Sequence, residues 1–321
     1  MKTPLLVAVL SIASAAFAQE TAAKEISVVA TNEDLAWFAR RIGGKDVKVE
    51  ALSRGDQDPH RIPAKPSFLI KLSRGDVLIQ TGLDQEHAWL PALLEASKND
   101  GIKPGGKGFV NASAGLVPLE VPADLNRAAG VDFHPRGNPH YLIDPEGGRL
   151  AARNIAAGLE RVRPEKAAIF RAGLAEFELE LDQRMIRWAV LAAPLKGRSI
   201  VVRHGLWPYL GARYGFTVAA DLEPKPGVEP SPVHVMKTIE VGRREKVVAV
   251  VVPQYAKEGL ARRTADEIGC PLVVLPSGTT GRAPSEDWFA FVEHTIRSLA
   301  DAARSTAGKA APIVDAPASR R

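Results

Sequence analysis

Three of the chain's seven histidines lie where an imidazole could bind a metal ion. His60 lies in a proline-rich loop, His140 precedes an expected helix, and His204 directly follows an expected strand. In parallel α/β sheets, ligands bind at the edge formed by the carboxyl ends of the strands. Neutral imidazole is a common nitrogen ligand of zinc and related metals. The trio is therefore a candidate metal site; the alternative for each histidine is a hydrogen bond or solvent contact without a ligand role.

The elements that must position this trio alternate between short apolar strands and amphipathic helices. The expected strands cover 26–30, 47–52, 77–81, 109–110, 199–203, 216–221, 247–252 and 272–275. The expected helices cover 32–43, 66–74, 145–161, 207–214, 232–243, 257–268 and 285–304. Such alternation is typical of parallel sheets with right-handed crossovers and helices on both faces. The sequence therefore predicts an α/β fold of two lobes, each with a four-stranded, mainly parallel sheet.

One long helix, over 164–193, is expected to join the two lobes. Its apolar residues recur at three- and four-residue steps and share one stripe. They are Phe170, Leu174, Phe177, Leu181, Met185 and Trp188. Pro164 suits a first helical turn and Pro194 ends the helix. At 1.5 Å per residue this rod is roughly 40 Å long, which is enough to span two small domains.

The ends of the chain have a different character from the lobes. Residues 1–18 combine a positive start, a short apolar run and a small-residue cleavage site, which is typical of a secretory signal peptide. We expect the N-terminal lobe over 19–163, the C-terminal lobe over 194–306 and a disordered tail over 307–321. The only cysteine, Cys270, is far from the cleavage site. The mature protein is therefore expected to be exported and soluble, without a lipid anchor.

The charge pattern argues against a nucleic-acid partner. The formal net charge is +5, but both signs are mixed along the chain and no basic stripe occurs. A basic stripe or patch is the electrostatic footprint that nucleic-acid binding requires. We therefore expect a small ligand and no nucleic acid.

Several short segments resemble, in order, the signatures of one family. These are Asp58-Pro59-His60 with Pro66-Ser67, Asn138-Pro139-His140-Tyr141 with Asp144-Pro145, His204 with Tyr209 and Arg213-Tyr214-Gly215, Glu229-Pro230-Ser231, and Pro253-Gln254-Tyr255. The family is that of the zinc- and manganese-specific periplasmic solute-binding proteins of ABC transporters, cluster A-I. The resemblance implies two α/β lobes joined by a rigid helix, with one metal ion bound between them.

The resemblance also implies a ligand set. His60, His140 and His204 match the three histidine positions of the family. The fourth position, usually an aspartate after the last strand, is Ser277 in this chain, and a neutral serine is a poor substitute. Glu223 is the first candidate for the missing carboxylate, and its alternative role is that of a solvated loop charge. His134, Asp58 and water are the other candidates.

The expected function is capture of Zn²⁺ in the cleft and delivery to a membrane-embedded ABC permease, by a monomer that is not an enzyme. Three imidazoles favour zinc over manganese, which prefers more oxygen ligands, although Mn²⁺ or another divalent metal is an alternative cargo. The rigid helix is expected to limit hinge opening, so that movement of ligand-bearing loops releases the metal. The rival function is a zinc hydrolase, with metal-bound water and Glu223 as general base.

Overall fold

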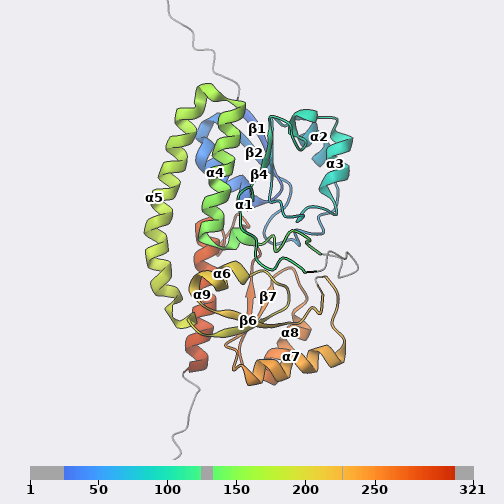
Figure 1. The fold of residues 1–321 in the computed structure, drawn as a ribbon, viewed down its shortest axis with the longest axis vertical. Coiled ribbons are helices and arrows are strands. Elements are labelled where there is room, and N and C mark those ends of the chain that lie inside the picture. The colour runs from blue at the N-terminus through green and yellow to red at the C-terminus, as the bar shows by residue number, and fades with distance from the viewer. Residues whose placement is uncertain (1–24, 124–132, 226, 308–321) are drawn as a thin grey trace, which may run out of the picture.

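The computed structural model describes residues 25–123, 133–225 and 227–307 (Figure 1). The predicted signal peptide, 1–18, lies outside the described residues. So does the predicted disordered tail, apart from Ala307, which is the last residue of a helix. The division into lobes at the proposed boundaries remains a prediction.

The N-terminal lobe is built on a four-stranded parallel sheet. Its strands lie in the order β2-β1-β3-β4, namely Val47–Ala51, Ile26–Ala30, Val77–Gln80 and Phe109–Asn111. Around the sheet lie α1 (Glu33–Gly43), α2 (Pro66–Arg74) and α3 (Leu90–Ser97). Asn32 caps α1, because its side chain accepts a hydrogen bond from the Leu35 amide. The strands match their expected positions, whereas α3 was not among the expected helices.

The C-terminal lobe repeats this architecture. Its sheet has the order β6-β5-β7-β8, with strands Thr217–Asp221, Ser199–Val202, Val250–Pro253 and Leu272–Leu275, all parallel. The helices are α6 (Pro208–Tyr214), α7 (Pro232–Arg244), α8 (Glu258–Ile268) and α9 (Trp288–Ala307). The expected strand over 247–252 begins three residues later, at Val250, although Val247, Val248 and Ala249 are buried. The predicted fold class is confirmed.

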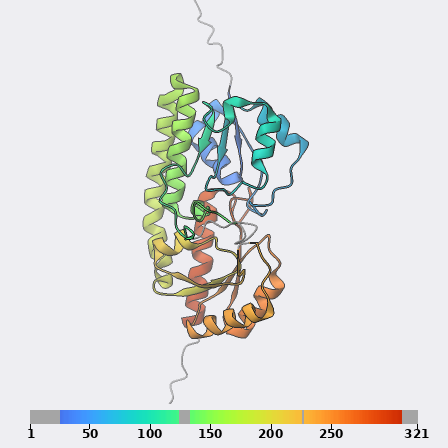
Figure 2. The ribbon, with the colours of Figure 1, turned by 45° about the vertical axis from the view of Figure 1, so that its right-hand side comes forward.

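Two long helices flank the lobes. They are α4 (Pro145–Val162) and α5 (Ala167–Ala192), and α5 lies between 3₁₀ turns Pro164–Lys166 and Ala193–Leu195. Figure 2 shows α5 running along both lobes. The expected apolar stripe is confirmed: Phe170, Phe177, Leu181 and Trp188 are buried, and Leu174 and Met185 pack against the same core. This helix therefore fixes the separation of the two sheets.

The two lobes share one apolar core. Trp288, the first residue of α9, is fully buried and donates a hydrogen bond of 2.8 Å to the Leu142 carbonyl. Its ring lies 4.9 Å from that of Phe38 in α1, and a Cβ at Gly148 would lie 2.1 Å from the indole. The last helix of the second lobe is thus anchored in the first. Within the described part of the chain, no helix has the length and apolar character that crossing a membrane requires.

Candidate metal centre

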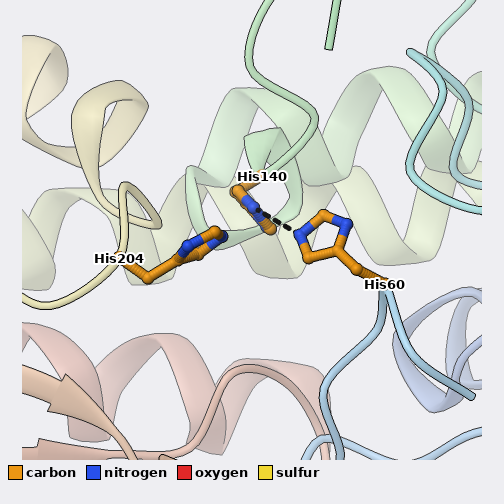
Figure 3. Close-up of side chains that lie close together, drawn as sticks. All are labelled: His60, His140 and His204. Carbon is orange, nitrogen blue, oxygen red and sulfur yellow. Dashed lines mark hydrogen bonds between the residues drawn. The ribbon is translucent and has the colours of Figure 1, made fainter. Parts of the chain in front are cut away.

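The structure brings the three candidate histidines together. One ring nitrogen of each of His60, His140 and His204 lies within 4.8 Å of the others (Figure 3). His60 comes from the loop between β2 and α2, His140 directly precedes the 3₁₀ turn Tyr141–Ile143, and His204 lies two residues beyond β5. The side chains are buried, with exposed fractions of 1%, 6% and 7% for the three residues in order. Two histidines from one lobe and one from the other therefore converge on one point.

The spacing of the rings suits a tetrahedral metal ion. The Nε2 atoms of His60 and His140 are 3.3 Å apart. Two nitrogens that each lie about 2.0–2.1 Å from a tetrahedral zinc are about 3.3–3.4 Å from each other. The rings meet edge to face, with centroids 5.1 to 5.4 Å apart. The trio can thus offer three nitrogen ligands to one cation.

Short polar contacts hold the two histidines of the N-terminal lobe. The carboxylate of Asp58 accepts a hydrogen bond of 3.0 Å from the His60 amide, and the side-chain oxygen of Asn138 accepts one of 2.9 Å from the His140 amide. The Asn138 amide group also donates to the Gly205 carbonyl at 2.7 Å. Asn138 therefore ties the His140 loop to the residue that follows His204 in the other lobe.

Glu223 lies beside His204 and does not belong to the converging group. Its Oε2 is 2.9 Å from His204 Nδ1 and accepts a hydrogen bond of 2.9 Å from the Gly227 amide. A carboxylate in this place fixes the imidazole tautomer with the proton on Nδ1, which leaves the Nε2 lone pair free. The structure therefore places Glu223 where its carboxylate can orient the His204 ring.

The other candidates for the fourth position are also placed. The His134 ring lies 4.8 Å from that of His60, and both of its nitrogens are buried without a hydrogen-bond partner among the described residues. Ser277 is turned toward the neighbouring lobe, since its hydroxyl donates to the Gly55 carbonyl at 2.9 Å. Among the described residues, neither His134 nor Asp58 joins the group of ligand atoms within 4.8 Å.

The electrostatic setting differs between the histidines. Burial lowers the pKa of His60 and His140 well below the ordinary value, and the neighbouring imidazoles lower it further. Burial also lowers the pKa of His134, to about 4. For His204 burial has the same sense, but the hydrogen bond and charge of Glu223 outweigh it and raise the pKa. His60 and His140 are therefore neutral at physiological pH, so that each ring has one nitrogen lone pair.

A close contact between loops joins the lobes beside the site. The Gly55 amide donates to the Thr279 carbonyl at 2.8 Å, and the Ser277 amide donates to the Gly55 carbonyl at 3.1 Å. The Thr279 amide donates to the carboxylate of Asp34 at 2.7 Å. A Cβ at Gly55 would lie 2.1 Å from the Gly278 carbonyl oxygen, so this crossing requires glycine. The loop after β8 is thus used to hold the His60 loop.

Sequence reasoning missed one polar residue near the trio, Gln85. Its side-chain amide nitrogen lies 3.5 Å from His140 Nδ1, and the residue is buried. The available signal was its place shortly after β3, on the sheet edge where ligands bind. The other histidines lie outside the trio: His234 contacts the Asp221 carbonyl and His87 the Asp84 carbonyl, both through ring nitrogens.

Two parallel-sheet lobes on one rigid helix, with a buried imidazole trio between them, define a metal-binding substrate-binding protein of an ABC transporter. The chain belongs to the family described as zinc-uptake complex component A, periplasmic, whose model matches residues 28–302. The resemblance inferred from the sequence motifs is therefore confirmed.

Curated relatives and solved structures agree with this class. The manganese ABC transporter substrate-binding lipoprotein PsaA of Streptococcus pneumoniae is 24% identical over 78% of this chain and 80% of its own. The metal ABC transporter substrate-binding lipoprotein SloC of Streptococcus mutans is 23% identical over 88% and 92%. A crystal structure of ZnuA superposes with a TM-score of 0.72 at 23% identity, over 87% of this chain and all of that one. The fold is therefore shared with ZnuA.

Proposed function

We propose that the protein captures Zn²⁺ outside the cytoplasm through Nε2 of His60, His140 and His204 and delivers it to an ABC permease. The observation that carries this proposal is the 3.3 Å separation of the His60 and His140 Nε2 atoms inside a buried group of three imidazoles. An all-nitrogen set favours zinc, because manganese prefers oxygen ligands. Within the described residues, no carboxylate joins the group. A water molecule completes the coordination, and Glu223 acts through His204.

Capture and release depend on loops in this proposal. The shared core and α5 hold the sheets at a fixed separation, so that wide rotation of the lobes would expose buried aromatic residues. The three ligands lie on connecting segments, which can move without disturbing the sheets. Equal hydrogen-exchange protection of these loops in the metal-free and zinc-loaded protein would contradict this mechanism.

Export and maturation form the second part of the proposal. We infer that the segment 1–18 is removed and that the mature protein is a soluble periplasmic monomer. The curated relatives are named lipoproteins, whereas the single cysteine here, Cys270, directly precedes the segment that enters β8. Mass spectrometry of the protein from its native envelope measures both the new N-terminus and any lipid. A diacylglyceryl mass on the mature chain would contradict the soluble form.

The decisive experiment is elemental analysis of the protein purified from its native source without chelators, followed by competition titrations with zinc. We expect one zinc per chain and a large loss of affinity in His60→Ala, His140→Ala and His204→Ala. His294→Ala in α9 is the matched control, since it removes a histidine far along the chain from the trio. If the three site variants bind zinc like the parent, the assignment is wrong.

A manganese carrier is the second candidate, and the names of the relatives favour it. PsaA is named a manganese transporter component, and a solved periplasmic metal-binding protein from Candidatus Liberibacter asiaticus is titled Mn-bound. Competition between Zn²⁺ and Mn²⁺ on the purified protein separates the two cargoes. A hydrolase role is less consistent with the site, because Oε2 of Glu223 is engaged by His204 and Gly227. Ester or peptide turnover abolished by Glu223→Gln would revive it.

A further inference from the structure

A turn of unusual backbone conformation follows β3. Gly82, Leu83 and Asp84 have φ values of 86°, 51° and 63°, so that three successive residues are left-handed. Residues other than glycine rarely adopt this conformation, and it persists only where the surrounding structure enforces it. A Cβ at Gly82 would lie 2.1 Å from the Asn111 side chain, which makes glycine necessary there. Among the described residues, only this turn places two non-glycine residues with positive φ next to each other, and such strain points to a constraint from function.

A buried carboxylate holds this turn in place. Oε1 of Glu86 accepts hydrogen bonds of 2.7 Å from the Thr81 amide and 2.7 Å from the Thr31 hydroxyl. Its Oε2 accepts a further one from the Gly82 amide at 3.3 Å. Glu86 is 5% exposed. The turn is thus fixed to the ends of β1 and β3 and cannot drift relative to them.

The segment that this carboxylate fixes reaches both histidines of the N-terminal lobe. Gln85 places its side-chain amide 3.5 Å from His140 Nδ1. Trp89, four residues on, donates from its indole nitrogen to the Pro59 carbonyl at 3.1 Å, directly before His60. One anchored segment thus contacts His140 and the residue before His60. Neither the spacing of the motifs nor the fold alone requires this arrangement. We propose that Gln85 is a positioning residue whose amide turns over when the metal binds, and thereby sets the tautomer of His140.

The tautomer argument follows from the donors and acceptors present. A neutral imidazole has one N–H and one lone pair, and a glutamine amide can present either its NH₂ or its oxygen. The Gln85 amide nitrogen lies 3.5 Å from His140 Nδ1, and an NH₂ group can only donate, so this contact matches the His140 tautomer with its proton on Nε2. In that tautomer the Nε2–H can donate to His60 Nε2, which is 3.3 Å away. This arrangement satisfies the metal-free site. It also blocks the nitrogen that the cation needs.

Metal binding requires the other tautomer. One proton leaves Nε2 of His140 for water, another is taken from water at Nδ1, and the ring stays neutral. A half-turn of the Gln85 amide then brings its oxygen to accept from Nδ1–H, and the Nε2 lone pair is free. A partner of this kind fixes ring orientation and raises ligand basicity. Gln85 therefore stabilises the empty and the loaded site with the two ends of one amide.

This inference rests on the proposed role of His140 as a ligand, and the test separates the two. Nitrogen-15 NMR of histidine-labelled protein, with His140 assigned by its absence in His140→Ala, reports which ring nitrogen carries the proton. We expect Nε2–H in the metal-free protein and Nδ1–H in the zinc-loaded protein. An Nδ1–H tautomer in both states would overturn the switch. Zinc binding by His140→Ala at parental affinity would instead overturn the proposed function.

Variants give a second test with the zinc affinity as its measure. Gln85→Leu removes both ends of the amide, and we expect about a 10-fold loss, the lower end of the range for such partners. Gln85→Glu keeps only the acceptor and is expected to restore the parental affinity or exceed it. The exposed Gln183 of α5 provides the control Gln183→Leu. Parental affinity in Gln85→Leu, or an equal loss in Gln85→Glu, would show that Gln85 does not act in this way.

The visible spectrum of the Co²⁺-loaded protein distinguishes positioning from mere packing. We expect the ligand-field bands of Gln85→Leu to shift relative to the parent, because the His140 ring is no longer oriented. The bands of Gln85→Glu should coincide with those of the parent. Unfolding curves of the metal-free variants show whether Gln85→Leu folds. Superimposable Co²⁺ spectra for the parent and a folded Gln85→Leu would contradict a positioning role.

Discussion

The two halves of the metal centre are built from the same side chain and behave oppositely. His140 in the N-terminal lobe and His204 in the C-terminal lobe are almost equally buried, at 6% and 7% exposed. Burial, together with the neighbouring imidazoles, lowers the pKa of His140, whereas His204 faces Glu223 and its pKa is raised. The difference teaches that burial keeps an imidazole uncharged and that one adjacent carboxylate reverses this effect.

This division of roles suits capture of a dication. In the proposed site, the two histidines of the N-terminal half donate lone pairs without carrying a competing positive charge. In the proposed site, the C-terminal half brings a carboxylate that offsets the charge of the bound cation. One half therefore supplies uncharged imidazoles and the other supplies negative charge, and substitutions can remove each contribution separately.

Placing a carboxylate in the neutral half should have the largest effect. His140→Asp replaces one nitrogen ligand by oxygen, which manganese tolerates better than zinc. We expect zinc affinity to fall by more than about 100-fold, beyond the range for partners outside the coordination sphere. Manganese affinity should fall far less, so that the preference for zinc narrows. Competition titration with both metals measures this, with His294→Asp as the control; an unchanged Zn/Mn ratio would argue that His140 is no ligand.

Removing the charge from the other half should have the next largest effect. Glu223→Gln keeps an oxygen that can face His204 Nδ1 but loses the negative charge. We expect zinc affinity to fall by about 10- to 100-fold, as for other partners of ligating histidines. The control is Glu229→Gln, which removes a charge paired with Arg203 and 75% exposed. An equal loss of zinc affinity in both variants would mean that Glu223 acts only through its negative charge and not through its contact with His204.

The dependence of stability on pH should have opposite signs for the two halves in the metal-free protein. The folded-state pKa of His140 is lowered. Its contribution to the free energy of unfolding is therefore fully present above the unfolded-state pKa of about 6.5, and it is lost as the pH falls through the folded pKa. The folded-state pKa of His204 is raised. Its contribution to the free energy of unfolding is therefore fully present below a pH of about 6.5, and it is lost as the pH rises through the folded pKa.

Denaturant unfolding between acid and neutral pH measures this contrast. The free energy of unfolding of the parent minus that of His140→Ala should rise with pH, and the same difference for His204→Ala should fall. Parallel slopes for the two variants would show that Glu223 does not reverse the effect of burial on its histidine.

The contact between the lobes should give the smallest effect on binding. Gly55→Ala places a methyl group against the Gly278 carbonyl and pushes the two loops apart. The His60 loop then loses one support but keeps the Asp58 and Trp89 contacts. We expect zinc affinity to fall by less than about 10-fold. Gly259→Ala, where the added methyl meets nothing, is the matched control. Zinc titration of both variants measures this effect. A larger loss of affinity in Gly259→Ala than in Gly55→Ala would contradict a role of the contact between the lobes in zinc binding.

The sequence predicted much of the fold because apolar periodicity directly reports which faces are buried. The strands and the stripe of α5 were accessible in this way, and so was the convergence of the trio, since parallel strands present their ends at one edge. Helix α3 was missed because its Leu90-Pro91 start and mostly apolar residues give no clear amphipathic period. The positions of Glu223 and Gln85 depend on how loops pack across the lobes, which local pattern does not encode.

Ser277 shows the same limit from the other side. The sequence indicated that a neutral serine is a poor metal ligand, but it could not indicate what the residue does instead. Its amide and hydroxyl both donate to the Gly55 carbonyl, a contact between residues 222 positions apart. A pairing between two irregular segments has no periodicity, so only the folded chain reveals it.

The burial of Trp288 in the first lobe has a consequence for biogenesis. Most of the chain must be synthesised before this indole can enter its place beside Phe38 and Gly148. The interior of the amino-terminal half therefore stays incomplete while the polypeptide is still emerging from the ribosome. For a precursor that crosses the inner membrane as proposed, late completion of this core would keep the chain unfolded and competent for translocation until almost all of it has crossed.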